Sequence, residues 1–311
     1  MTASMNGHTH LFPGPILAEL EDGSSLLTDT AGLARFIKDQ GYLYLKGLLP
    51  VGGVLAARRD LLERCKRTGR LKPGTRLRDG IVNPEPTMEK RVPVKPRPWP
   101  RAVQKLFKSA TLLRLFDHLF AEPSLCLDLK IVRKYVRGSS TGIHYDIVYL
   151  GRGSRRVMTC WIPLGDIPVE LGPLAVCAGS NSLHGFEKLR RTYGQLDVDQ
   201  TLMRGAKGSF PGWFSLDLTE ITKRFGGQWR TAHFTAGDVM VLTSTTLHCG
   251  LDNLTDHVRM SADLRFQPRS EPADPRWMGD CPPGNTEAHR LHRNELEADT
   301  TLEAARAVWG V

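Results

Sequence analysis

The chain has 311 residues, of which 41% are hydrophobic and 24% are charged, and its net charge is +9. This composition is ordinary for a folded globular protein and excludes collagen-like or low-complexity chains. The positive charge favours an anionic partner or substrate. However, the densest basic patches are not interleaved with stacking aromatics, so they predict no nucleic-acid surface; these patches are Arg64–Arg67, Arg70–Arg78, Arg152–Arg156 and Lys188–Arg191.

Location is predicted from two further features. The first residues lack a basic segment followed by an apolar run, which is the pattern of an export signal. No stretch is apolar for as long as a membrane span requires. We therefore expect neither export nor membrane insertion. No two cysteines form a Cys-x-x-Cys pair, which argues against a zinc ribbon or a disulfide framework. We therefore expect reduced thiols in a cytoplasmic protein; they are Cys65, Cys126, Cys160, Cys177, Cys249 and Cys281.

The chain begins with residues that predict little regular structure. Residues 1–15 are expected to be an irregular lead-in, with a short extended piece near Ile16. Asp29-Thr30 is a helix-cap signal before apolar residues at helical spacing, and Gly41 is a stop signal. A helix is therefore predicted between them.

The next segments predict alternating strand, helix and loop. Tyr42–Leu45 should be the first strand, and 54–65 has the spacing of a helix. Residues 72–101 are rich in proline and charge, which predicts a long loop that either acts as a lid or simply wraps the body. Residues 102–119 are predicted to be a helix packed outside the strands.

Four later segments are predicted to be the strands of one barrel. Alternation or β-branched and aromatic content marks 125–132, 157–162, 239–242 and 259–266. Between them, 180–227 is an insertion, and its aromatic patch includes Trp213 and Phe214. These two rings could line a substrate pocket or pack in the core. Towards the end, 285–309 is predicted to be largely helical, with anchors at Leu302, Val308 and Trp309.

His144, Asp146, His248 and Arg259 predict a metal site. In an extended segment, alternation puts positions 144 and 146 on one face and Tyr145 on the other. Two imidazoles and one carboxylate can hold one face of an Fe(II) ion and leave three positions open. A single His-x-Asp has roughly one chance in ten of binding metal, because short motifs give false positives. The conjunction with His248 and Arg259, both in or beside strand-like contexts, is far stronger.

With these motifs in place, the chain resembles the phytanoyl-CoA dioxygenase family of Fe(II)/2-oxoglutarate-dependent oxygenases, from near Gly32 to Pro268. The resemblance is carried by His144-Tyr145-Asp146, the segment Trp161–Ile167, Gly172–Val176 with Gly179-Ser180, and His248 with Asn253 and Arg259. Two positions depart from the family's usual residues. Asn181 stands where a His is frequent, and Gly250 stands where a Ser is frequent, but neither position is a ligand.

The resemblance implies roles for particular residues. His144, Asp146 and His248 would bind iron, and Arg259 would hold a carboxylate of 2-oxoglutarate; we predict that Trp161 and Thr159 also bind the co-substrate. Because Asp146 is present, halogenation is disfavoured, since similar halogenases replace this carboxylate with a small residue. Trp213 and Phe214 are the predicted substrate residues.

The overall prediction is a mainly β protein with flanking α-helices and a double-stranded β-helix, or jelly-roll, core. It would be a single domain over 1–311, with its core at about 32–268 and a helical extension at about 285–309. Using Fe(II), 2-oxoglutarate and O2, it would hydroxylate or otherwise oxidise an unactivated C–H bond of a small molecule of secondary metabolism, either anionic or neutral. Alternatives are an acyl-CoA hydroxylase or a cupin-like metal protein without oxygenase activity. Nucleic acid and membrane are not expected partners, and oligomeric state is left open.

Overall fold

The computed structural model describes residues 1–84, 99–200, 203–204, 212–280, 282 and 300–311. Parts of three predicted segments lie outside these residues: the middle of the 72–101 loop, a piece of the 180–227 insertion that includes Phe210 and Pro211, and the start of the 285–309 helix. Cys281, His289 and His292 also lie outside. None of the helices in the described ranges combines the length and apolar character that crossing a membrane requires.

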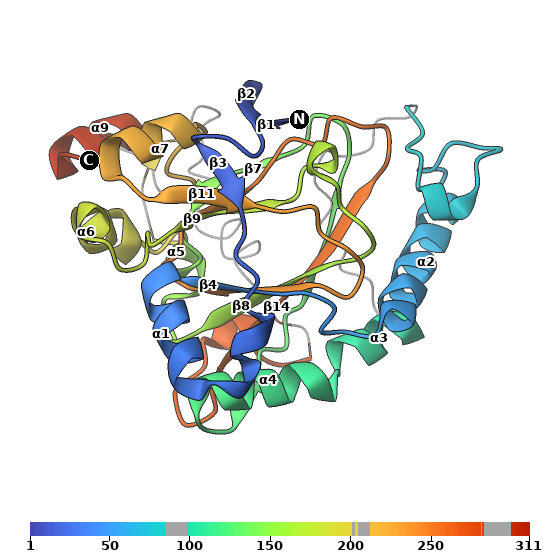
Figure 1. Cartoon of the computed structure of the whole chain (residues 1–311), viewed down its shortest axis with the longest axis horizontal. Coiled ribbons are helices and arrows are strands. Elements are labelled where there is room, and N and C mark those ends of the chain that lie inside the picture. Colours follow the sequence, from blue (N-terminus) through green and yellow to red (C-terminus); the bar gives the residue numbers. More distant parts are fainter. Residues whose placement is uncertain (85–98, 201–202, 205–211, 281, 283–299) are drawn as a thin grey trace.

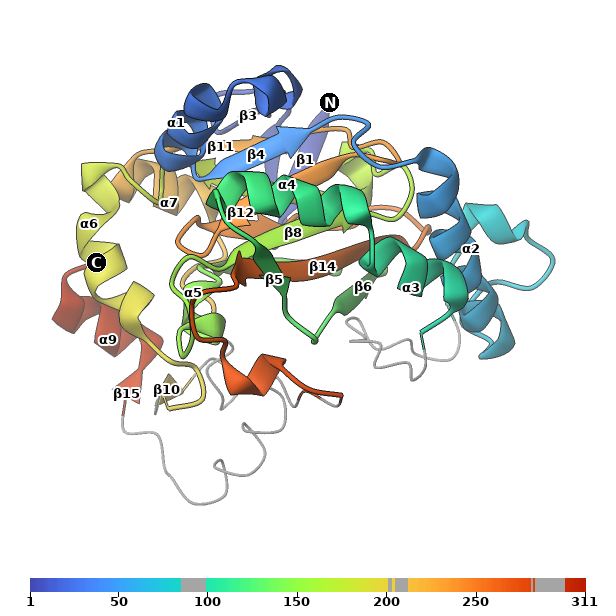
Figure 2. The same cartoon turned by 90° about the horizontal axis from the view of Figure 1, so that it is seen from below.

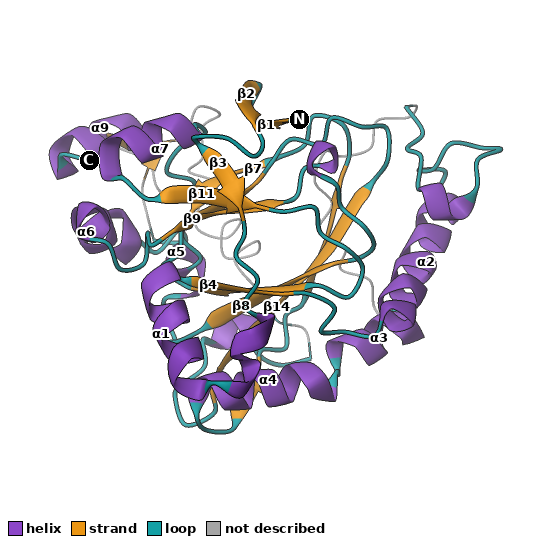
Figure 3. Ribbon diagram, viewed as in Figure 1, coloured by secondary structure: helices purple, strands orange, loops and turns teal. Residues whose placement is uncertain are grey.

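Two facing sheets form the centre of the molecule (Figure 3). The five-stranded sheet has the order β3-β11-β9-β13-β7; these strands are Leu17–Glu19, Gln228–Thr231, Leu174–Ala178, His248–Gly250 and Thr141–His144. The six-stranded sheet has the order β4-β12-β8-β14-β5, with β6 also paired to β14; these strands are Tyr42–Leu45, Val239–Thr243, Met158–Pro163, Arg259–Pro268, Ser124–Cys126 and Ile131–Tyr135. This arrangement is the predicted jelly roll with flanking helices.

Alternation along the strands separates the interior of the sandwich from its outer faces. On β14, Met260, Ala262, Leu264 and Phe266 pack into the hydrophobic cluster under the helices. The intervening Arg259, Asp263 and Arg265 line a pocket between the sheets. Because successive strand residues point to opposite faces, ten consecutive buried residues present an apolar face to the helices and a polar face to the interior.

Helices cover the outer faces of both sheets (Figures 1 and 2). The six-stranded sheet packs against α1, α2, α3 and α4, which span Thr30–Gln40, Val51–Arg67, Arg101–Phe107 and Ala110–Phe120. For example, Phe116 stacks on Phe266 with ring centroids 4.0 Å apart. The five-stranded sheet packs against α6, α7 and α9, which span Glu187–Arg191, Leu218–Phe225 and Leu302–Trp309. A short helix, α5, spans Ile147–Leu150.

The predicted first helix and strand are found where the sequence placed them. The Asp29 side chain accepts a hydrogen bond from the Gly32 amide at 2.9 Å, which caps α1. Gly41 ends α1 in the left-handed region at φ 78°, where a side chain would be strained. The strand β4 follows immediately.

Several local predictions were wrong. Residues 1–15 are not irregular but hold a hairpin of β1, Thr2–Met5, and β2, His8–Leu11. Asn6 and Gly7 at its tip both have positive φ, which is the turn that an Asn-Gly pair favours. The 102–119 helix is broken, because Ser109 is extended and separates α3 from α4.

The predicted 125–132 strand is two strands, β5 and β6. Between them, Leu127 still donates its amide to the Arg265 carbonyl of β14 at 2.9 Å, and its side chain packs with Leu150 and Trp277 in a separate cluster. Leu125, Leu129 and Ile131 pack against the same cluster, so the apolar alternation marks one face across both strands and gives no sign of the break between them. In the C-terminal extension, Leu302 and Trp309 pack against the body as predicted, but Val308 is 86% exposed and is not an anchor.

Candidate active site

His144 and His248 lie opposite each other on neighbouring antiparallel strands of the five-stranded sheet. His144 is the last residue of β7, His248 is the first residue of β13, and the two are paired in register. Both side chains are buried, with ring centroids 4.2 Å apart. The neighbouring Cys249 points the other way, into the core, as predicted. Strand pairing alone thus brings together two histidines that are far apart in sequence.

A bulge in β7 sets the direction of the residues before His144. Gly250 pairs with Thr141, although His248 pairs with His144, so β7 has one more residue than β13 over this stretch. A bulge of this kind re-aims side chains, and Thr141 and His144 consequently both line the pocket. Gly142 lies within the bulge with the Trp213 ring against it, where a Cβ would come within 2.5 Å of that ring.

Asp146 completes the cluster from just beyond the strand. It is helical, with φ −67° and ψ −26°, and leads into α5. The prediction that the segment from His144 to Asp146 is extended was therefore wrong, although Tyr145 does point into the core and Asp146 does face the histidines. Asp146 Oδ1 lies 3.7 Å from the Nε2 atoms of both His144 and His248. One ligand atom from each residue lies within 4.8 Å of the others.

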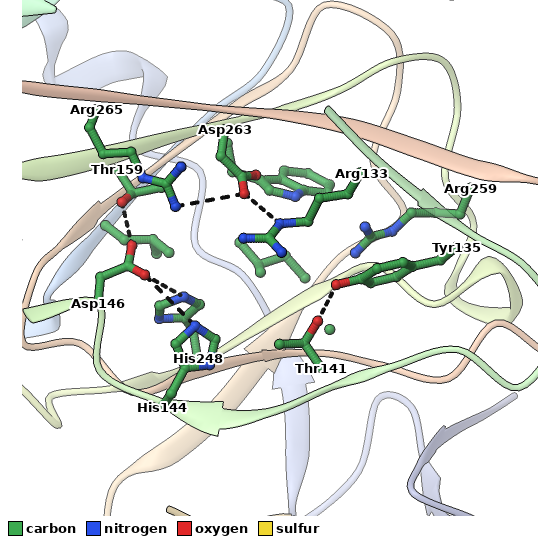
Figure 4. Close-up of a pocket in the computed structure, with 14 residues that line it drawn as sticks. Arg133, Tyr135, Thr141, His144, Asp146, Thr159, His248, Arg259, Asp263 and Arg265 are labelled. Carbon is green, nitrogen blue, oxygen red and sulfur yellow. Dashed lines mark hydrogen bonds and ion pairs between the residues drawn. The ribbon is translucent and has the colours of Figure 1, made fainter. Parts of the chain in front are cut away.

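Hydrogen bonds orient all three side chains. His144 Nδ1 lies 2.7 Å from the Gly142 carbonyl oxygen, and His248 Nδ1 lies 3.0 Å from the Thr246 carbonyl oxygen. A carbonyl oxygen can only accept, so each Nδ1 donates and each neutral ring presents the Nε2 lone pair to the cluster. The Thr159 hydroxyl donates to Asp146 Oδ2, which leaves Oδ1 directed at the histidines (Figure 4).

The protonation states suit metal binding. Burial and the neighbouring His248 hold the pKa of His144 well below 6.5. Burial alone would raise the pKa of Asp146, but His248, Arg265, His144 and the Thr159 hydroxyl together lower it below its ordinary value. A neutral imidazole and an ionised carboxylate are the forms that ligate a metal.

Arg259 lies at the other end of the same pocket, as the first residue of β14. It is 1% exposed; its Nε donates to the Gly172 carbonyl at 3.0 Å, and its Nη1 donates to the Ser261 hydroxyl at 3.1 Å. Its Cζ lies 4.3 Å from the centroid of the Tyr135 ring and 5.6 Å from that of Trp161. Burial lowers the pKa of Arg259 to about 10, so it remains charged at neutral pH. Within the described ranges no carboxylate is in ion-pair distance of this guanidinium.

Trp161 and Thr159, the other predicted co-substrate residues, lie on β8 and also line the pocket. Trp161 is buried, and its indole Nε1 has no hydrogen-bond partner in the described part of the chain. The Thr159 hydroxyl is already used by Asp146. Thr159 is thus placed to orient a metal ligand, and contact with the co-substrate stays a prediction for both residues.

The substrate residues predicted from the insertion lie apart from this pocket. Phe214 is 1% exposed and packs in the core with Tyr193 and Phe225, with the Arg306 guanidinium over its ring. Neither Phe214 nor Trp213 is among the residues that line the pocket. Phe214 is therefore a core residue here. The substrate role of Trp213, which covers the bulge beside His144, stays a prediction.

Sequence reasoning missed other polar residues that line the pocket: Arg133, Tyr135, Thr141 and Asp263. Arg133 and Tyr135 alternate on β6, and Asp263 alternates with Arg259 and Arg265 on β14. The alternation of β14 was visible in the sequence and could have indicated Asp263. Nothing in the sequence of β6 showed which face would be interior.

The site fits a divalent metal with a dicarboxylate co-substrate. Two imidazoles and one carboxylate on one side of a pocket are the facial donor set of non-haem iron sites. At the other end, the described residues leave the buried Arg259 guanidinium without a carboxylate partner and the nearby Trp161 indole N–H without a hydrogen-bond partner, which fits an incoming carboxylate. These two features belong to one pocket (Figure 4).

Comparison with known proteins identifies relatives of the whole domain. Residues 37–261 match the family described as phytanoyl-CoA dioxygenase. The chain is 24% identical over 268 residues to the 1-deoxypentalenic acid 11-beta-hydroxylase of Streptomyces arenae, which covers 81% of this chain and 86% of the relative. It is 25% identical over 264 residues to the enzyme of the same name from Streptomyces exfoliatus, and this match covers 82% of this chain and 87% of the relative.

Solved structures share the fold. The α-ketoglutarate-dependent carbocyclase SnoK from nogalamycin biosynthesis matches with a TM-score of 0.52 and 21% identity, covering 78% of this chain and 85% of its own. The α-ketoglutarate-dependent epimerase SnoN, also from nogalamycin biosynthesis, matches with a TM-score of 0.52 and 17% identity, covering 80% of this chain and 86% of its own. EctD from S. alaskensis with bound Fe matches with a TM-score of 0.52 and 18% identity, and the match covers 78% of each chain. These likenesses confirm the jelly-roll architecture.

Proposed function

The chain belongs to the phytanoyl-CoA dioxygenase family and is an oxidoreductase that depends on iron and 2-oxoglutarate; we propose that His144, Asp146 and His248 hold the iron and that Arg259 anchors the co-substrate. The observation that carries this assignment is the pocket itself. It has a buried His-Asp-His cluster at one end and a buried guanidinium without a carboxylate partner in the described part of the chain at the other. A metal-binding jelly roll without oxygenase activity would have no need for the second feature.

The substrate we propose is a small organic molecule of secondary metabolism. Both curated relatives are named as hydroxylases of 1-deoxypentalenic acid, and SnoK and SnoN belong to nogalamycin biosynthesis. Hydroxylation is the reaction named for the two Streptomyces relatives, whereas SnoK is named a carbocyclase and SnoN an epimerase. Desaturation, epoxidation and ring formation use the same metal centre and differ in how the substrate is placed. Five free cysteines in the described ranges support our proposal of a cytoplasmic location.

The residues of the pocket would have separate roles in holding the metal and the co-substrate. His144 and His248 would offer their Nε2 atoms to the metal, because each Nδ1 faces a backbone carbonyl, and Asp146 would offer Oδ1 while Thr159 holds Oδ2. Arg259 would fix the far carboxylate of 2-oxoglutarate, and the Trp161 and Tyr135 rings would exclude water from that ion pair. When bound, iron and 2-oxoglutarate supply oxidising power through oxygen-dependent decarboxylation to succinate and CO2.

The test is to measure succinate formation against 2-oxoglutarate loss in the protein reconstituted with Fe(II). We expect slow turnover without substrate that disappears in Asp146→Ala. A protein that holds iron but forms no succinate under any condition would contradict an oxygenase and favour a binding protein or isomerase. Crystals soaked with candidate substrates would then show which one places a C–H bond beside the cluster.

A further inference from the structure

The described part of the pocket carries more positive charge than the proposed metal and co-substrate need. Three arginines line it, Arg133, Arg259 and Arg265, against two carboxylates, Asp146 and Asp263. The charges of a divalent metal and of the 2-oxoglutarate dianion sum to zero. The three arginines therefore exceed the two carboxylates by one positive charge. A buried charge without a partner is costly, and this excess favours a further anion in the site.

The excess charge is not at Arg259, which the co-substrate would neutralise. It lies at Arg133 and Arg265, which share Asp263. Asp263 Oδ2 accepts from Arg133 Nε at 2.5 Å and lies 3.8 Å from Arg265 Nη2. Arg133 and Arg265 both interact electrostatically with Asp146, so both lie beside the proposed metal site.

Both guanidinium groups have donors to spare. Asp263 occupies the Nε side of Arg133, and neither Nη atom of Arg133 has a hydrogen-bond partner among the described residues; its side chain is 17% exposed, towards the pocket. Arg265 is 3% exposed; its Cζ lies 5.3 Å from the centroid of the Trp277 ring, but its Nε and Nη1 have no hydrogen-bond partner in the same ranges. In Figure 4 the Arg133 guanidinium lies between Asp146 and Arg259, and the Arg265 guanidinium lies at the Asp146 end of the pocket.

We propose that Arg133 and Arg265, positioned by Asp263, form a second anion subsite that binds a carboxylate on the organic substrate. The inference rests on the proposed function and names its substrate class. The Nη1 and Nη2 atoms of Arg133 form the planar fork that matches a carboxylate. One excess charge fits a monoanion rather than a phosphate dianion. Anchored there, a substrate would present its carbon skeleton beside the His-Asp-His cluster.

The experiment compares acids with neutral analogues on the protein loaded with Ni(II) and saturating 2-oxoglutarate, so that Arg259 is occupied and no turnover occurs. The probes are 1-deoxypentalenic acid and octanoic acid, each with its methyl ester, measured by calorimetry. We expect at least one acid to bind, with an affinity about tenfold or more above that of its ester, as expected for a charge-assisted pair. Arg133→Gln should abolish this preference, and Arg133→Lys should retain part of it.

The matched control is Arg137→Gln, because Arg137 follows β6 but is exposed and pairs with Asp256 outside the pocket. This variant should keep the preference for the acid. Melting temperature and the 2-oxoglutarate dissociation constant report on folding and on the co-substrate site. Equal binding of acid and ester, no binding of either acid, or a preference for the acid that survives in Arg133→Gln would overturn the subsite. So would a larger loss of 2-oxoglutarate affinity than of acid affinity in Arg133→Gln.

These failures are separable from failure of the proposed function. Wild-type protein that forms succinate from 2-oxoglutarate without substrate has a working iron site whatever the acid titrations show. If the wild type forms none, the proposed function fails as well. If it does, an absent acid preference removes the second anion subsite alone.

Discussion

His144 and His248 are cross-strand partners in the five-stranded sheet, and Asp146 Oδ1 lies at the same 3.7 Å from the Nε2 atom of each. The pairing of β7 with β13 therefore holds two proposed ligands on rigid backbone, and the turn into α5 brings the third to them. A site built on strands in this way is prearranged for the metal rather than assembled by it.

His248→Ala should lose most of its iron. One of three proposed ligands disappears, and the loss of affinity should exceed the roughly 10- to 100-fold typical of residues that only orient a ligand. Metal content after anaerobic loading and desalting measures this. His184→Ala is the control, because His184 is exposed and pairs with Glu187 on the surface. A full complement of iron in His248→Ala would refute the ligand assignment.

Thr159→Val should weaken metal binding by about 10- to 100-fold without changing the size of the side chain. The variant removes the hydroxyl that donates to Asp146 Oδ2, so the carboxylate loses its fixed orientation. Competition with a chelator gives the dissociation constant. Thr231→Val is matched to it, because Thr231 is also buried and donates to a backbone carbonyl away from the cluster. Similar losses in both variants would indicate a general effect on folding.

Arg259→Gln should raise the dissociation constant for 2-oxoglutarate about 30-fold or more while metal binding stays near normal. Removing one partner of a buried charge pair costs roughly 2–5 kcal/mol. Calorimetric titration of the Ni(II)-loaded protein measures it, with the surface variant Arg224→Gln as the reference. Unchanged affinity in Arg259→Gln would move the anchor elsewhere, with Arg265 as the first candidate.

Gly250→Ala should weaken 2-oxoglutarate binding by a smaller factor. A Cβ at this position would lie 3.1 Å from the Tyr135 ring and 3.4 Å from Arg259 Nη2, so one of them must shift. Displacing a side chain from its preferred rotamer costs roughly 0.5–1.5 kcal/mol, which is about 2- to 12-fold in affinity. The same titration measures it. Gly53→Ala, where nothing lies within 4 Å of the added Cβ, should have no such effect.

Trp213→Ala should reduce turnover of the true substrate more than the slow, substrate-independent loss of 2-oxoglutarate. The ring covers Gly142 in the bulge beside His144, and loops of this kind shape substrate access. Comparing the two rates in one preparation gives the result. Equal reductions in both rates would mean that Trp213 supports the bulge and the metal site rather than the substrate.

Much of the site was predictable from the sequence because its signals are local. His144, His248 and Arg259 stand at strand ends and Asp146 lies two residues beyond β7, so short motifs mark all four. Asp29 with Gly41 delimits α1 by capping chemistry that involves neighbours in the chain. The jelly-roll core followed from the same strand patterns and from the family resemblance. Asn6-Gly7 was an equally local signal for the N-terminal hairpin, and it was overlooked.

Only the tertiary structure decided which residues the proposed ligands meet. The bulge that turns Thr141 and His144 to one side depends on pairing between β7 and β13, more than a hundred residues apart in the chain. The Asp263 carboxylate reaches Arg133 only because β6 pairs with β14, the strand that carries both Asp263 and Arg265. Phe214 became a core residue because Tyr193, Phe225 and Arg306 enclose it. Alternation tells which residues share a face of one strand, whereas register between distant strands decides what that face will touch.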